Sequence, residues 1–366
     1  MCKILVWSFD YLAGLFFFYV GGTTWAINRL SAAHARRPNH IGTLSRLAWC
    51  MAEVESFNDA VSHYQKLVGF LPGDPVAMFA YATALQKSGR HADAIAAFEA
   101  ALDRDPTNGA IPYNLAESLR ACGRMQDALV AYRRAAILQP GAWDVLGNLG
   151  AILGTLGHWQ EALEYHRRAM DLRPNSVHAY NLAVTLGELK RWPEAEQALR
   201  NALRFEPHSI ELKLRLAVSL GEQGKYSEAL RALREVAATQ PDNATALSLL
   251  SSTLILTGSA DSAVDVASDL IRQHPAFAEG HGVLAWAHFK KGSVHEALRC
   301  YDRAIALDQN IADLHAGRGA ILASIGRYRE AKDAFLAAIA ITPDILQENS
   351  EYANCYSLTE RALSSN

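Results

Sequence analysis

Apolar and polar positions along the chain follow a pattern that repeats about every 34 residues. Each unit has two stretches in which apolar residues recur at the spacing of one helix face, with a short polar turn between them. In the unit that ends at Pro174, this spacing predicts one helix from about Trp143 to Leu156 and a second from about Gln160 to Leu172. Gly157 lies between them, where a left-handed residue commonly ends a helix.

Prolines keep the same register along the chain. From Pro38 onward they stand 34 residues apart, with one interval of 33 and with Gln309 in one proline position. The register defines nine units, which are 39–72, 73–106, 107–140, 141–174, 175–207, 208–241, 242–275, 276–309 and 310–343. A fixed period of this length indicates a solenoid, in which each unit packs on its neighbours instead of around one central core.

Two positions hold a small residue in every unit. In the first helix they are Ala48, Ala82, Ala116, Gly150, Ala183, Ala217, Ser251, Ala285 and Gly319. In the second helix they are Ala60, Ala94, Ala128, Ala162, Ala195, Ala229, Ala263, Ala297 and Ala331. Small residues at fixed sites let two helices approach closely, so we expect the helices of each unit to pack against each other there.

These features resemble the tetratricopeptide repeat family. The resemblance rests on the 34-residue period, the two small positions, the closing proline and the second-helix aromatics, which include Tyr64, Phe98, Tyr132, Tyr301 and Phe335. Departures are mild: His166, Leu199, Leu233 and Ala267 replace that aromatic, and Arg318 replaces a core leucine. The resemblance covers about 39–343 and implies an all-α solenoid, a right-handed superhelix of antiparallel helix pairs whose first helices line a concave groove.

The N-terminus has a different composition. Residues 4–27 are almost entirely apolar, with Asp10 as their one charge. As one helix this segment would be about 36 Å long at ~1.5 Å per residue, enough for a bilayer core of roughly 30 Å. We therefore expect a hydrophobic transmembrane helix over 1–28, a linker over 29–38, nine repeats over 39–343, and a capping helix with a tail over 344–366.

Two alternatives remain for this segment. It can be a signal peptide cleaved after Ala33-His34-Ala35, or an apolar helix buried in a partner. For a retained anchor, the arginines that follow it, Arg29, Arg36 and Arg37, place the repeats in the cytoplasm by the positive-inside rule. A cleaved signal would place them outside the inner membrane, in the periplasm.

Bulk composition narrows the classes of function. The formal net charge of −3 over 366 residues gives no bulk electrostatic case for a nucleic-acid partner, which would require a basic face, although a local basic patch stays open. Five scattered cysteines without a CxxC pair argue against a disulfide framework or a zinc ribbon.

Motifs for catalysis or metal binding are incomplete. GEQGKYS at 221–227 lacks the spacing of a phosphate loop, and HEAL at 295–298 lacks the second histidine of a zinc protease. His281 and His288 are about 10.5 Å apart along one helix, too far to share a zinc ion, so we interpret them as packing residues. We expect no enzyme activity, no cofactor, no metal and no catalytic domain beyond the repeats.

The resemblance implies a protein or peptide partner in the concave groove. The groove-facing positions of the middle units select Tyr113, Asn114, Glu117, Arg120, Asn148, Tyr180, Asn181 and Arg215. The three asparagines share one slot, and such a row can hydrogen-bond a peptide backbone, as does the similar ladder in the superhelix of O-GlcNAc transferase. The alternative is that these asparagines are solvated or bonded to the neighbouring helix.

Farther along the same face, Trp286 and Phe289 are candidate apolar anchors for the partner, or they pack beneath the superhelical turn. The sequence as a whole predicts a non-enzymatic, membrane-tethered scaffold that assists the assembly of a complex. The alternatives are an accessory subunit of a membrane enzyme or secretion machine, and an exported periplasmic binding protein.

Overall fold

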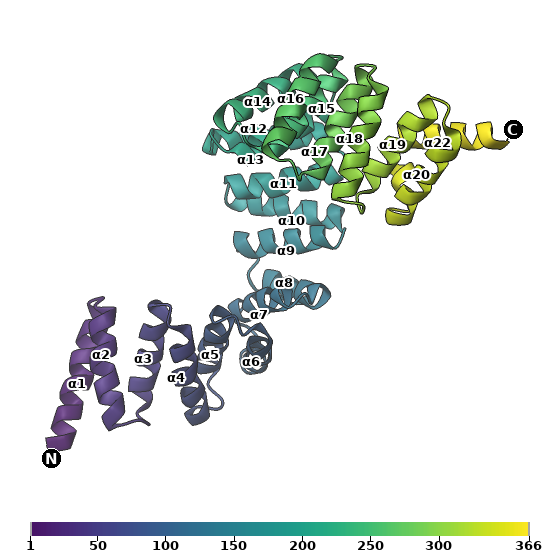
Figure 1. The fold of residues 1–366 in the computed structure, drawn as a ribbon. Helices are drawn as coiled ribbons and strands as arrows, with labels where there is room; N and C mark the ends of the chain where they lie inside the picture. The colour runs from purple at the N-terminus through teal and green to yellow at the C-terminus, as the bar shows by residue number, and fades with distance from the viewer. Residues whose placement is uncertain (1, 365–366) are drawn as a thin grey trace. The chain divides into compact units, whose positions relative to one another are not determined.

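The computed structural model describes residues 2–364, with the backbone alone at residues 2–5 and 348. All regular structure in these residues is α-helical, which confirms the all-α part of the predicted fold class. The chain divides into two compact units, Met1–Thr185 and Leu186–Asn366. Within each unit, successive helices run antiparallel and pack on their neighbours along the chain (Figure 1).

The first unit is built from the helices α1 (Cys2–Tyr19), α2 (Thr23–Arg36), α3 (Ile41–Glu53), α4 (Phe57–Phe70), α5 (Pro75–Lys87), α6 (His91–Arg104), α7 (Ala110–Ala121), α8 (Met125–Leu138), α9 (Trp143–Thr155) and α10 (Trp159–Leu172). The boundary between the units falls inside α11 (Ser176–Glu188). The helices α9 and α10 match the two predicted for the unit that ends at Pro174 to within a residue at each end.

The second unit is built from the helices α12 (Trp192–Phe205), α13 (Ile210–Glu222), α14 (Tyr226–Thr239), α15 (Ala244–Leu256), α16 (Ala260–Gln273), α17 (Ala278–Lys290), α18 (Val294–Leu307), α19 (Ala312–Ser324), α20 (Tyr328–Ile341), α21 (Ile345–Glu348) and α22 (Ser350–Ser364). The helix α22 packs on α19 and α20, and its Tyr356 ring lies edge-on to Phe335 at 5.6 Å.

The small positions bring the two helices of a pair into contact, as expected. A methyl group added to Gly150 would lie 2.6 Å from the His166 ring, and one added to Gly319 would lie 3.2 Å from the Phe335 ring. The alanines that open the second helices are fully buried, for example Ala162 and Ala331. The core is therefore a row of such contacts instead of a single centre.

The turn inside each of the nine sequence-defined units contains one residue with a positive φ. Seven of these residues are glycines, including Gly157 at φ +79°. The other two are Glu55 (φ 59°) and Lys190 (φ 56°), which occupy the same place in their units. A side chain in this left-handed region costs about 1–2 kcal/mol, so the turn geometry is imposed there against the local preference.

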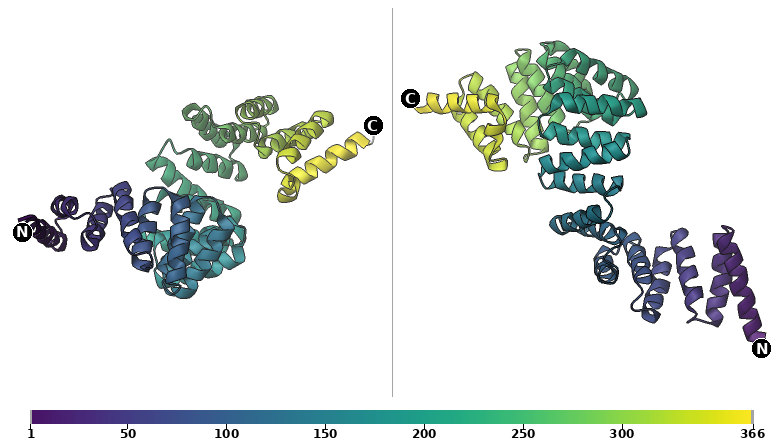
Figure 2. Two further views of the ribbon diagram at one scale, coloured as in Figure 1. Left: turned by 90° about the horizontal axis from the view of Figure 1, so that it is seen from below. Right: turned by 180° about the vertical axis from the view of Figure 1, so that it is seen from behind.

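The apolar N-terminus does not form the single helix predicted over 1–28. Gly21, at φ +80°, and Gly22 end α1 and turn the chain back into α2, which packs along α1 and beside α3 (Figure 2). Residues 29–36, expected as part of a linker, are the last turns of α2. Within the described residues, every helix is too short or too polar to cross a membrane.

The N-terminal pair follows the repeat register. Its key residues each lie 34 positions before their counterparts in the unit 39–72: Gly14, Gly21, Ala26, Leu30 and Pro38. A methyl group on Gly14 would lie 2.8 Å from Leu30, the same small-to-large contact as in the other pairs. The segment is therefore an additional, unusually apolar helix pair that precedes the nine predicted units.

Asp10 stabilises this pair. Its carboxylate is 4% exposed and accepts hydrogen bonds from Arg29 at 3.3 Å and from Arg36. A buried carboxylate without partners would be costly, so both arginines of α2 contribute to holding α1 in place.

His166 brings a titratable group into the core of the unit 141–174. It is 3% exposed, and its Nδ1 has no hydrogen-bond partner among the described residues. Burial, reinforced by the neighbouring His178, lowers the pKa of His166 from 6.5 to about 4. The pKa of His178 is also lowered, by burial and by Arg173, against the opposite effect of Asp144.

We predict that Lys190→Gly stabilises the protein, because glycine adopts the left-handed turn without a Cβ clash. The expected gain in the free energy of unfolding is about 0.5–1 kcal/mol, since the lost strain exceeds the entropy that glycine adds to the unfolded chain. Chemical denaturation measures it. Lys190→Ala removes the same charge but keeps the strain, so a gain of equal size in that variant would contradict the explanation.

We predict that acid destabilises the protein through His166. The folded-state pKa lies below the unfolded one, so the unfolded chain takes up the proton first, and stability present above pH 6.5 is lost as pH falls towards 4. Between pH 7 and 4.5 the loss is about 2 kcal/mol for this group. The variant His166→Phe keeps a ring at this position but cannot be protonated. Chemical denaturation of the variant should show a loss of unfolding free energy between pH 7 and 4.5 that is about 2 kcal/mol smaller than in the wild type. An unchanged pH dependence would refute the role given to His166.

Candidate functional site

The middle of the first unit contains a polar network centred on Glu117 of α7. Its carboxylate accepts hydrogen bonds from Arg120 Nη2 at 2.9 Å, from Asn148 Nδ2 at 3.2 Å and from the Tyr132 hydroxyl. Asn148 also donates to the Tyr113 hydroxyl at 3.0 Å. The structure thus brings together four of the predicted groove residues, because the network joins α7, α8 and the following first helix, α9.

Burial sets the protonation of the two tyrosines in this network. It raises the pKa of Tyr113, with added effects of Glu117 and Asp144. It also raises the pKa of the fully buried Tyr132, and the hydrogen bond to Glu117 adds to the shift. Both phenols stay protonated at neutral pH, so neither acts as a base; Tyr132 donates to Glu117, and Tyr113 accepts from Asn148.

A cavity of 280 Å³, the Glu117-network cavity, opens beside these residues; Arg120, Tyr132, Asn148, Ile152 and Thr155 are among those that line it. Arg120 is exposed at its edge, while the asparagine amide faces its own network. The cavity therefore offers an arginine head and an apolar wall to a partner.

The asparagine slot is used differently in successive units. Asn114 donates to the Ala110 carbonyl of its own helix at 2.9 Å, and Asn148 is bonded to the neighbouring helix. Asn181 and Tyr180 are half-buried on α11, and Arg215 is exposed on α13 of the second unit. Two of the three amides are thus already engaged within the chain, which favours the alternative to a free asparagine ladder.

In the second unit, Trp286 and Phe289 are neighbours on α17, with ring centroids 5.3 Å apart. Both are half-buried against the core formed by α17–α20 and α22. Trp286 also lines a cavity of 340 Å³, here called the Trp286 cavity, whose walls come from α15, α17, α18, α19 and the start of α22. The two rings therefore pack on the core, as one alternative expected, and Trp286 also lines a cavity that a partner can enter, as the other alternative expected.

Sequence reasoning missed the acidic wall of the Trp286 cavity. Glu279 and Asp313, which line it, stand 34 residues apart in the slot that Asp144 and Glu211 occupy in earlier units. This 34-residue spacing is the sequence signal from which the two carboxylates could have been predicted as neighbours. Glu351 and Tyr352 come from α22, beyond the repeat register, so the repeat pattern could not place them in the cavity.

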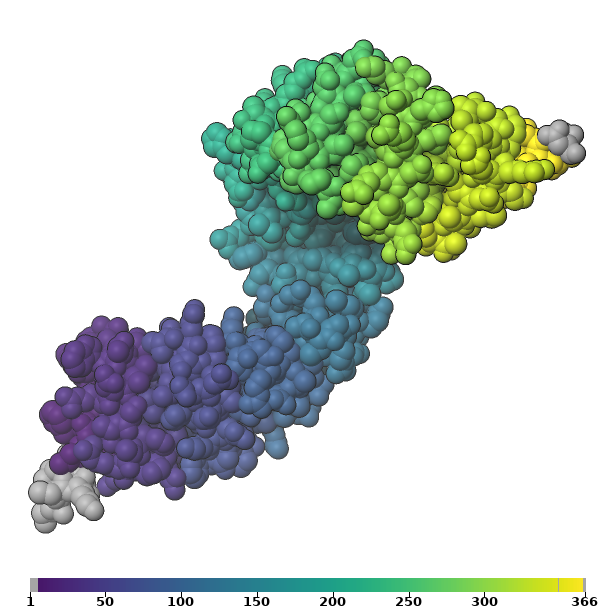
Figure 3. Space-filling model, in the orientation of Figure 1, coloured from purple at the N-terminus to yellow at the C-terminus, as the bar shows by residue number. Residues whose placement is uncertain are grey.

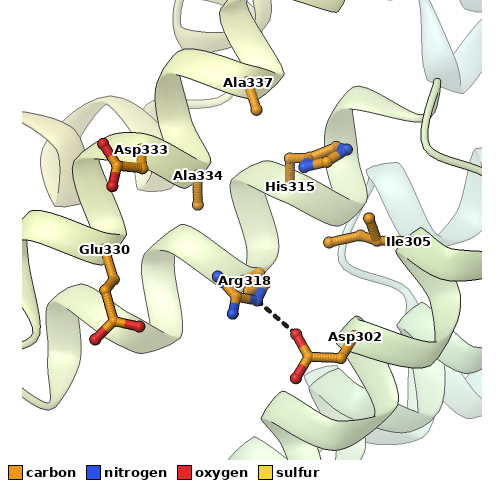
Figure 4. Close-up of a pocket in the computed structure, with 8 residues that line it drawn as sticks. All are labelled: Asp302, Ile305, His315, Arg318, Glu330, Asp333, Ala334 and Ala337. Carbon is orange, nitrogen blue, oxygen red and sulfur yellow. Dashed lines mark hydrogen bonds and ion pairs between the residues drawn. The ribbon is translucent and has the colours of Figure 1, made fainter.

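A larger cavity of 420 Å³ lies beside Arg318, between α18, α19 and α20 (Figure 4). Arg318 Nε donates to Asp302 at 2.8 Å, and Glu330 pairs with Arg327 outside it. The residue that departs from the repeat pattern is therefore turned to the side of the second helices. Its charges are mostly neutralised by partners in the chain, so this cavity is a weaker binding candidate.

At the N-terminal end, a cavity of 480 Å³ lies where Phe18 of α1 meets Trp49 of α3, with ring centroids 4.9 Å apart. Arg46 lines it and donates to the Tyr11 hydroxyl at 3.3 Å. It continues the row of cavities along the first helices of this unit.

Cysteine and metal chemistry find little support in the residues that the structure describes. Burial, with a contribution from Glu53, raises the pKa of Cys50 to about 11, and burial likewise raises that of Cys300 and Cys355. These thiols stay protonated at neutral pH and are poor nucleophiles. No group of three or more potential metal ligands occurs among residues 2–364.

Comparison with known proteins identifies the repeat. Models described as tetratricopeptide repeat match residues 85–151, 144–173, 178–205, 220–287 and 312–345, and one described as TPR repeat matches residues 286–326. The human Superkiller complex protein 3 is 35% identical over 75 residues, which are 20% of this chain. The match spans 5% of that relative's length.

Solved structures share the fold. A tetratricopeptide repeat protein from Parabacteroides merdae has 18% identity and a TM-score of 0.52, with 78% of this chain and 98% of that chain covered. The TPR protein TTC0263 of Thermus thermophilus has 21% identity and a TM-score of 0.46, with 49% and 98% covered. At 18% identity, the Parabacteroides merdae structure supports the fold alone.

Proposed function

Since the chain belongs to the tetratricopeptide repeat family, we propose that it is a non-enzymatic scaffold that binds an extended segment of a partner protein along its first helices. The observation that carries the proposal is the row of cavities on that side. In the first unit, the Glu117-network cavity is lined from the first helices α7 and α9 and from the second helix α8. In the second unit, the Trp286 cavity is lined from α15, α17 and α19.

The position of the first helices supports a groove in the second unit. The first helices α15, α17 and α19 touch one another in succession, as expected for helices on the inner side of a superhelical curve. A cavity on this side faces a concave surface, where an extended chain can contact several helices at once. Binding one segment across several repeats would let the protein hold a partner in place during the assembly of a complex.

We predict that peptides selected from a displayed random library lose affinity when the groove is changed. Trp286→Ala or Arg120→Ala should weaken binding of a selected peptide about tenfold in calorimetric titration, because each removes a lining side chain from one of the two cavities. Leu336→Ala, which truncates an exposed residue of the second helix α20, is the control. Selected peptides that are insensitive to both groove variants would refute the proposed groove.

The proposal includes attachment to a membrane surface through the outer face of the N-terminal pair. Side chains more than 60% exposed line this face at helical spacing and at the turn into α2: Phe9, Leu12, Phe16, Tyr19 and Trp25. The pair lies at the free end of the first unit (Figure 3), so the first unit leaves this face uncovered.

Arginines border the apolar face. The Arg29 guanidinium lies 5.7 Å from the Phe9 ring centroid, and that of Arg37 lies 4.2 Å from the Trp7 ring centroid. Aromatic and apolar residues beside arginines are typical of helices that lie in the interface of an anionic bilayer without crossing it. The segment would thus lie on the membrane, in contrast to the spanning helix expected from its hydropathy.

We predict that the protein floats with vesicles of phosphatidylcholine and phosphatidylglycerol in a density gradient. The double variant Phe9→Glu/Phe16→Glu should abolish flotation, because it places two carboxylates on the apolar face. The control Val130→Glu/Ile137→Glu adds the same charges at two exposed positions of α8. Wild-type protein that stays at the bottom, or equal flotation of both variants, would count against membrane attachment.

A further inference from the structure

The Trp286 cavity combines an apolar floor with an acidic rim. Ile255, Val283 and Leu314 form much of the apolar surface, together with the rings of Trp286, Tyr301 and Tyr352. The lining also includes the carboxylates of Glu279, Asp313 and Glu351, and it contains no lysine or arginine. A ligand that fits this lining has a long apolar stem and a positively charged head.

Tyr301 adds a hydroxyl group to the lining of the cavity. The residue is 5% exposed and lines the cavity, and its hydroxyl has no hydrogen-bond partner among the described residues. The ring lies close to Gly317, where a methyl group would sit 2.4 Å from the hydroxyl oxygen. Tyr301 therefore offers a hydroxyl, both a donor and an acceptor, to a ligand in the cavity.

The electrostatic field in the cavity is negative. Burial raises the pKa of Tyr352 above its usual value, and the charges of Asp313 and Glu351 raise it further. The same two carboxylates act on Tyr301 in the same direction, after burial and Tyr352. A field that opposes a tyrosinate anion at this place favours a cation there.

The chain already places one cation at the edge of the cavity. The Lys290 ammonium lies 4.5 Å from the Trp286 ring centroid and 4.0 Å from the Glu351 carboxylate. The lysine is itself partly exposed, and it leaves Glu279 and Asp313 without an ion-pair partner among the described residues. Lys290 thus shows the contacts that this aromatic and acidic surface makes with a basic side chain.

We propose that the Trp286 cavity binds an arginine side chain of an extended segment of the partner protein, an inference that rests on the proposed scaffold function. The guanidinium lies on the Trp286 ring and pairs with Asp313 or Glu279, and its stem packs on Val283. Arginine fits better than lysine because its planar head can stack on an aromatic ring and donate two parallel hydrogen bonds to a carboxylate.

The test uses the full chain and defined peptides. An array carries heptapeptides of alternating Leu and Ser whose central residue is each amino acid in turn or citrulline, the neutral isostere of arginine. Peptides with central arginine should bind best, and in titration they should bind about tenfold more tightly than the citrulline peptides. Raising the salt concentration should reduce this preference.

Three variants locate the preference in the cavity. Glu279→Gln/Asp313→Asn should reduce the affinity for the arginine peptide about tenfold and leave the citrulline peptide unaffected. Lys290→Met should strengthen arginine binding about threefold, because it removes a competing cation from Trp286 and Glu351. Asp333→Asn, an exposed carboxylate of the Arg318 cavity, is the matched control and should change nothing.

The outcomes separate this inference from the proposed scaffold. Equal binding of arginine and citrulline peptides that Trp286→Ala abolishes would overturn the arginine preference and leave the groove intact. An effect of Asp333→Asn as large as that of the cavity variant would overturn it as well. Absence of binding by every peptide in the array would overturn both the arginine site and the groove.

Discussion

The close contact between a small residue of a first helix and a large side chain of the second helix holds each pair of this chain together. Gly14 meets Leu30, Gly150 meets His166 and Gly319 meets Phe335 in this way. Because the contact returns with the repeat period, each pair also presents a regular surface to the next one. The cavities along the first helices exist only because this packing sets the distance between neighbouring helices.

Periodicity predicted the fold well and local chemistry less well. The helix ends around Gly157 followed from its spacing, but no local signal marks Lys190 and Glu55 as left-handed, since that conformation is imposed by the neighbouring pairs. The N-terminal pair was missed because its average hydropathy outweighed its register, although Gly21 and Pro38 keep the 34-residue spacing. Average hydropathy describes the transfer of a lone helix and does not detect a partner helix such as α2.

At the candidate sites too, the repeat pattern predicted which residues are neighbours but not how their side chains are bonded. Repeat position selected Tyr113, Glu117 and Asn148 as neighbours of the groove, and the structure joins them. Which amide turns to its own helix and which to the next depends on side-chain rotamers and on partners such as Tyr132, which a repeat pattern does not encode. The Trp286 cavity could not be predicted because α22 forms part of its wall, and the 34-residue repeat does not specify where α22 packs.

His166 places a titratable side chain in the core of one central helix pair. In a linear array, stability is the sum of each pair's own contribution and its coupling to its two neighbours. A charge forced on one central pair breaks both couplings at once, so the pairs before it and after it become two shorter arrays that melt separately. A pH near 4 would thereby divide the cooperative unit of unfolding, while the helices on either side remain folded.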